Sequence, residues 1–139
     1  MTAGFVVDAS VAAAWFLPGE ATPVTEAALL ATVTTQVWVP MLWTLEMGNL
    51  LLSAHRRRRI NDAKRIELVA AAAALRLRVD REAVSMLELD ALAARHQLTS
   101  YDATYLELAI RRALPLATLD SALLAAMEKA GVARAEFAV

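Results

Sequence analysis

The sequence contains no cysteine, which excludes disulfide bonds, zinc–cysteine sites and thiol nucleophiles. Proline and glycine are scarce, with 4 of each among 139 residues, and there is no repeat, linker or low-complexity tract. No apolar run approaches the roughly 18 residues that a membrane span needs. The first residues also lack the basic and then apolar pattern of a signal peptide. We therefore expect an unexported, cytoplasmic protein with no membrane partner.

An excess of positive charge is also missing, because the net charge is -1. Proteins that hold a polyanion mainly through charge usually carry a clear basic excess, so this balance counts against nucleic-acid binding. The hydrophobic share of 58% excludes a disordered chain and leaves apolar surface for a partner. The length suits one domain, and we expect residues 1–139 to form it.

Apolar runs and capping residues predict strands that alternate with helices. The expected strands lie at residues 5–7, 36–39, around 79, and within 114–120, with a last short strand after Gly131. The expected helices span residues 10–17, 24–31, 41–56, 61–77, 80–96, 100–112 and 120–130. Parallel neighbours need crossover connections, so this order predicts an α/β fold with a parallel sheet covered on both faces.

Particular side chains are expected to start these helices. Ser10, Asn61 and Asp80 are expected N-caps, and Thr99 or Ser100 caps the helix that contains YDATYLELA. Thr22 followed by proline has the pattern of an N-cap with proline at the first helical position.

Two aspartates follow apolar strands, and ligands of open α/β sheets bind beyond the carboxyl ends of the strands. Asp8 and Asp120 should therefore face one crevice. Helix capping explains each of them equally well, and Asp102 in a first helical turn suits the helix dipole.

Glu46 is harder to explain by local structure. On its helix it shares a face with Leu42, Leu45, Asn49 and Leu50, where a charge is costly unless it is paired. The alternative is a glutamate at the helix rim, or one that is paired to an arginine.

If these acids converge, their repulsion raises their pKa values and destabilises the fold unless a cation neutralises them. Magnesium prefers oxygen ligands and is held by one or two carboxylates, so four acids suit one ion or two. Without cysteine or a histidine pair, zinc is disfavoured. A magnesium site activates water for attack on phosphorus, which predicts phosphodiester hydrolysis.

The segments VVDAS, PMLWTLEMGN, LTSYDATYLELA and LATLD together resemble the PIN domain, and specifically the VapC toxins of toxin–antitoxin pairs. The resemblance implies a three-layer α/β/α fold with a parallel sheet of four or five strands. It also implies an endoribonuclease that uses Mg²⁺, or Mn²⁺ as a substitute, and that a small VapB-like antitoxin protein inhibits.

The family's functional positions transfer to this sequence residue by residue. Its four acidic positions, which bind metal and carry catalysis, fall on Asp8, Glu46, Asp102 and Asp120. By the same likeness Ser10 and Thr118 support metal, water or substrate, and Asn49 supports the site one helical turn from Glu46. Some relatives carry a further acid just after the last aspartate, whereas Ser121, Ala122 and Leu123 stand here.

Other conspicuous residues have competing explanations. Arg56, Arg57, Arg58 and Arg59 suit the phosphates of an RNA backbone, or equally a solvated helix end. The tryptophans, Trp15, Trp38 and Trp43, are more typical of core or interface than of base stacking. His55 and His96 lie near helix ends and are left out of the site.

The apolar helix at residues 41–54 and the alanine-rich helix after it predict a homodimer. A non-catalytic PIN-like module that only pairs with an antitoxin or dimerises is the main alternative. A receiver-type phosphoacceptor domain would need adjacent acids early and a lysine late, but Asp8 has no acidic neighbour and Lys129 lies beyond the expected sheet.

Overall fold

A parallel sheet forms the centre of the protein, which is described here by a computed structural model over residues 4–138. Its four strands stand in the order β3-β2-β1-β4. They are β1 (Phe5–Val7), β2 (Val37–Pro40), β3 (Leu77–Asp80) and β4 (Leu116–Ala117). All three pairings are parallel, so the carboxyl ends of the strands lie along one edge. In place of the last short strand, a single bridge joins Leu116 to Arg134.

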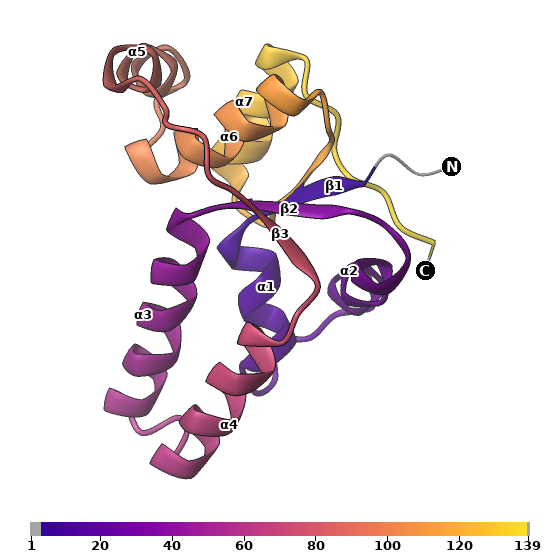
Figure 1. The fold of residues 1–139 in the computed structure, drawn as a ribbon, viewed down its shortest axis with the longest axis vertical. Helices are drawn as coiled ribbons and strands as arrows, with labels where there is room; N and C mark the ends of the chain where they lie inside the picture. Colours follow the sequence, from indigo (N-terminus) through magenta and orange to yellow (C-terminus); the bar gives the residue numbers. More distant parts are fainter. Residues whose placement is uncertain (1–3, 139) are drawn as a thin grey trace.

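The described residues form seven helices around the sheet. They are α1 (Ala9–Phe16), α2 (Pro23–Thr34), α3 (Leu42–Arg56), α4 (Asp62–Ala73), α5 (Met86–His96), α6 (Ser100–Arg112) and α7 (Ser121–Ala130). Figure 1 shows α1 and α2 on one face of the sheet and α6 and α7 on the other, while α3 and α4 extend from it as a pair. The expected three-layer α/β/α architecture is confirmed. None of the helices in residues 4–138 combines the length and apolar character needed to cross a membrane.

The two central strands, β1 and β2, are apolar and largely buried between the helical layers, whereas the edge strand β3 also carries Arg78 and Asp80. Val6, Val7, Val37 and Val39 are fully buried in one core cluster. Since helices cover both faces, side chains that point either way must be apolar. Leu116 extends the same core through β4.

Several helix ends match the capping pattern in the sequence. Thr22 accepts a hydrogen bond from the Thr25 amide, with proline at the first helical position. Asn61 and Thr99 cap α4 and α6 in the same way. Gly131 ends α7 in the left-handed conformation, with φ of 74°.

Other expected boundaries were wrong. Asp8, not Ser10, caps α1, because its carboxylate reaches the Val11 amide. The alanine-rich helix ends at Ala73 and not near residue 77, because Leu77 already pairs with Val37 in the sheet. Asp80 does not begin a helix: it ends β3, and α5 starts six residues later with Ser85 as its cap.

Candidate active site

The four predicted acids line one cleft of about 820 Å³. Asp8 follows β1 and caps α1, whereas Asp120 follows β4 and caps α7. Glu46 lies in the second turn of α3, and Asp102 lies in the first turn of α6. The adjacency of β1 and β4 brings the first two acids to the same edge of the sheet, and the two helices add the others. Capping and cleft lining are therefore compatible in the two strand-end aspartates.

The Asp8 carboxylate is buried, with 4% of the residue exposed, and it is held from several sides. Its Oδ1 accepts hydrogen bonds from the Ser10 hydroxyl at 2.7 Å and the Val11 amide at 3.1 Å. Its Oδ2 accepts a hydrogen bond from the Thr118 hydroxyl. The Thr118 and Ser10 hydroxyls in turn accept from the amides of Asp120 and Leu119. This network fixes the Asp8 carboxylate at the junction of β1 and β4.

Glu46 is half-buried and is oriented by a tyrosine. The Tyr105 hydroxyl donates a hydrogen bond of 2.6 Å to Glu46 Oε1, across from α6 to α3. Tyr105 itself is 1% exposed, so its position is set by the core. Neither alternative explanation of Glu46 holds, since it is not a solvated rim residue and has no arginine partner among the described residues. The sequence gives one indication that Tyr105 belongs to the site. It lies three residues after Asp102 in the same helix, so the two side chains share a face.

The acids in the cleft repel one another. Burial is the main cause that raises the pKa of Asp8 above its ordinary value, against the opposing effect of its hydroxyl partners. Burial, and then the charges of Asp102 and Asp8, raise the pKa of Glu46. Burial and the charge of Asp120 raise the pKa of Asp102. Within residues 4–138 none of these carboxylates has an ion-pair partner.

The donor set fits a hard divalent cation held through water. Carboxylate oxygens are the ligands that Mg²⁺ prefers, and this ion usually keeps several waters while one or two carboxylates bind it. In the described part of the chain no three acidic or histidine side chains converge on a single coordination point. The side chains therefore fit an ion with one or two direct carboxylate contacts and water-mediated contacts to the others.

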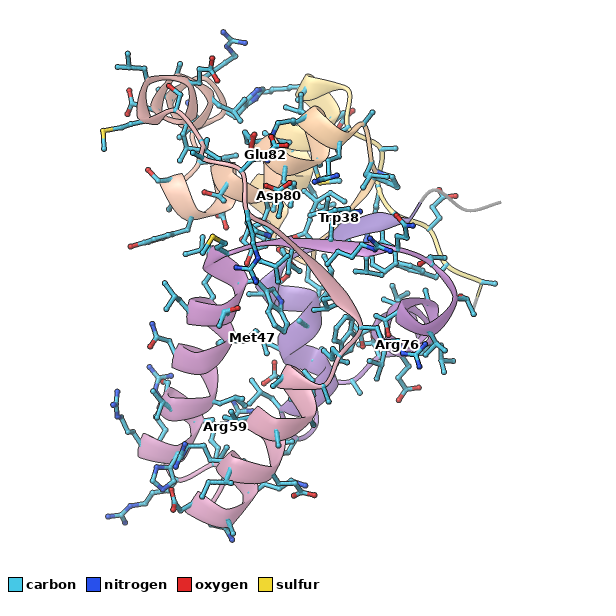
Figure 2. The ribbon with its side chains drawn as sticks, in the orientation of Figure 1. Trp38, Met47, Arg59, Arg76, Asp80 and Glu82 are labelled. Atoms are coloured by element: carbon cyan, nitrogen blue, oxygen red, sulfur yellow. The ribbon has the colours of Figure 1, made fainter. Side chains whose placement is uncertain are left out.

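The remaining predicted site residues are distributed unevenly. Ser10 and Asn49 line the cleft, and Thr118 lies directly behind it against Asp8. Of the arginine run, Arg59 alone lines the cleft, where its Nη2 lies 2.9 Å from Glu20 Oε2. Figure 2 shows Arg59 well below the sheet, towards the far end of α3. Arg56, Arg57 and Arg58 are exposed outside the cleft.

The tryptophans and histidines do not line the cleft. Trp43 is buried in the core, and the Trp15 indole donates to the Thr25 carbonyl. Trp38 lies under the Arg112 guanidinium, 3.4 Å from the ring centre. The expectation that the tryptophans have packing roles agrees with these positions. Sequence reasoning missed Tyr101 and Glu20 as cleft residues, and no local pattern around Glu20 pointed to the site.

Comparison with known proteins assigns the fold to a family. Residues 5–129 match the PIN domain family. The crystal structure of PAE2754 from Pyrobaculum aerophilum is similar, with a TM-score of 0.69 and 26% identity over 91% of this chain and 86% of that chain. A search of curated proteins found no match. PIN domains are generally nucleases and typically use divalent metals, which agrees with the acidic cleft. The chain belongs to the PIN domain family.

Proposed function

We propose that this protein is a metal-dependent endoribonuclease that hydrolyses RNA phosphodiester bonds at the acidic cleft. The observation that carries the proposal is the convergence of Asp8, Glu46, Asp102 and Asp120 on one cleft, where none of the four has an ion-pair partner among the described residues. The pKa values of Asp8, Glu46 and Asp102 are raised, mainly by burial, and acids with perturbed pKa values in a cleft are typical of functional sites. Mg²⁺, or Mn²⁺ in its place, is the proposed cofactor.

The four carboxylates would hold the metal, directly or through water. When bound, such an ion activates water as a nucleophile and stabilises the leaving oxygen. The chain's own residues position this arrangement. Ser10 and Thr118 hold the Asp8 carboxylate from two sides, and Tyr105 holds Glu46 by one oxygen, which leaves the other oxygen free to face the cleft.

Arg59 is the residue of the arginine run that supports a phosphate contact. It lines the cleft, and its pairing with the half-exposed Glu20 is a surface interaction that a phosphate can replace at little cost. The eight residues of α1 separate Arg59's end of the cleft from Asp8 by about 12 Å, given a helical rise of about 1.5 Å per residue. Arg59 would therefore contact another phosphate of the same RNA strand, away from the phosphate at Asp8.

The decisive experiment is incubation of the purified protein with RNA in magnesium or in chelator, followed by mapping of the cut ends. We expect cleavage in magnesium alone. Asp8→Asn and Glu46→Gln should each lower kcat by more than about a hundredfold, beyond the usual effect of residues that act only through a ligand. Asp62→Asn replaces an exposed aspartate on α4 and serves as the matched control. Chelator-resistant cleavage, or full activity of Asp8→Asn, would contradict the proposal.

We further infer that the protein acts as the toxin of a VapBC-type pair, with a VapB-like antitoxin as partner. The sequence resemblance supports this role, and exposed apolar side chains support a protein interface. Ile66 and Val69 on α4 are 56 and 42% exposed, Met41 just before α3 is 56% exposed, and we propose that α3 and α4 form a homodimer interface. A sedimentation mass of one chain would contradict the dimer, and tight antitoxin binding without RNA cleavage would favour the non-catalytic alternative.

A further inference from the structure

Tyr101 is the exposed aromatic residue of this chain, with 62% of its surface accessible. All other aromatic residues are buried or half-buried. Tyr101 lies in the first turn of α6, directly before Asp102, and lines the acidic cleft. One turn further along, Tyr105 is buried and bonded to Glu46. The core therefore explains Tyr105 but not Tyr101.

Two leucines bring further apolar surface to the same cleft. Leu45 of α3 is 67% exposed, and Leu119, just before α7, is 47% exposed. These side chains come from different elements and converge beside the carboxylates. An apolar group of this kind, rimmed by polar residues, marks a place where a ligand's apolar surface binds. The flat face of a nucleobase beside a metal-bound phosphate matches this mixture of charges and apolar atoms.

We propose that Tyr101 is a stacking platform for a nucleobase next to the scissile phosphate, with Leu45 and Leu119 covering the base edge. The proposal rests on the nuclease function and identifies a residue that binds its substrate. A base can reach an aromatic ring only when it is unpaired and unstacked from its neighbours. The platform therefore takes an unpaired base of the RNA, and it tolerates different bases because each base has a π-face.

The test compares Tyr101→Phe with Tyr101→Leu in the cleavage of a short unstructured oligoribonucleotide in magnesium. Phenylalanine keeps the ring, so its KM should stay near that of the unchanged protein. Leucine keeps the apolar surface but removes the ring, and KM should rise by about five- to a hundredfold, the usual worth of one stacked base. The kcat should change little, because Tyr101 holds no reacting group. Equal KM values for the two variants would overturn the proposal.

A binding measurement separates failure of the platform from failure of the nuclease function. In Tyr101→Trp, we expect the new indole fluorescence to be quenched by the oligoribonucleotide but not by polyphosphate, which carries phosphates without bases. If the protein cleaves RNA but Tyr101→Trp shows no quenching and Tyr101→Leu has an unchanged KM, the stacking role of Tyr101 is refuted and the nuclease function stands. If the unchanged protein does not cleave RNA, the nuclease function is refuted. The quenching of Tyr101→Trp then shows separately whether a base binds at this position. A change in oligomeric mass without a change in RNA affinity would instead assign Tyr101 to a protein interface.

Discussion

Two buried aspartates lie at the carboxyl edge of the same sheet and have opposite electrostatic surroundings. Asp8 follows β1 with 4% of its surface exposed, and Asp80 ends β3 with 5% exposed. Asp80 accepts hydrogen bonds from the guanidinium groups of both Arg111 and Arg112, at 2.9 to 3.0 Å. Asp8 has hydroxyl and amide donors and no cationic partner in the described chain.

The pKa values of the two groups move in opposite directions. Burial by itself would raise the pKa of Asp80, but the hydrogen bonds from Arg111 and Arg112 outweigh it, and the pKa is lowered. Burial dominates at Asp8, so its pKa is raised. The same residue type at equivalent ends of two strands is thus paired with arginines in one place and has no cationic partner among the described residues in the other. We call the cluster of Asp80, Arg111 and Arg112 the neutralised region. Figure 2 shows Asp80 there, with Glu82 and Trp38 nearby.

The largest effect is expected from breaking the neutralised region. Asp80→Asn removes the carboxylate that both arginines share: Arg111 keeps Glu82 and Glu107, but Arg112 loses its carboxylate partner, and loss of one partner of a buried ion pair is strongly destabilising. Because both arginines are partly exposed, we expect a loss near the low end, about 3 kcal/mol of unfolding free energy. Urea denaturation measures this loss. As a control, Glu67→Gln removes the exposed ion pair with Lys64 and should not measurably change the unfolding free energy. An equal loss of unfolding free energy in both variants would show that the buried pair contributes no more than an exposed one.

Magnesium should stabilise the cleft but not the neutralised region. A ligand at ten times its Kd raises the unfolding free energy by about 1.4 kcal/mol when it binds the folded state alone. We expect this increment for the unchanged protein and for Asp80→Asn, and its loss in Asp8→Asn. Thermal melts with magnesium and with chelator measure it. A stabilisation that survives in Asp8→Asn would place the ion elsewhere.

A smaller effect is expected from Arg112→Lys. The guanidinium of Arg112 donates to Asp80 and stacks over Trp38, and both contacts require its planar group. Lysine keeps the charge but loses the stacking, so we expect a loss of about 1 kcal/mol, the scale of a partly desolvated cation–π contact. Trp38→Leu should cost less in the lysine background than in the unchanged protein. Equal costs in the two backgrounds would show that the stacking contributes nothing.

Asp80 also shows where sequence reasoning stopped. An aspartate after an apolar residue predicted a helix cap, whereas its partners Arg111 and Arg112 lie about thirty positions away and are brought to it by the packing of α6. Asp8 and Asp120 were predictable because strand ends in a parallel sheet share one edge. Glu46 was predictable because a charge interrupts an apolar helix face. Tyr101 and the Glu20–Arg59 pair depend on side-chain exposure across different elements, which spacing along the chain does not encode.

The smallest expected effect is the pH-dependent change in Tm that comes from the carboxyl group of Glu46. Its pKa is raised in the folded protein by burial and by the charges of Asp102 and Asp8. Between its ordinary value of 4.5 and the raised value, the folded state binds more protons than the unfolded state, so stability increases as pH falls through that window. Glu46→Gln removes the charge and should raise Tm in chelator by roughly 1–3 °C at neutral pH. This advantage should vanish below pH 4.5, where the carboxyl group is protonated in both states. A Tm difference that is constant across pH would mean that packing, and not the charge of Glu46, causes it.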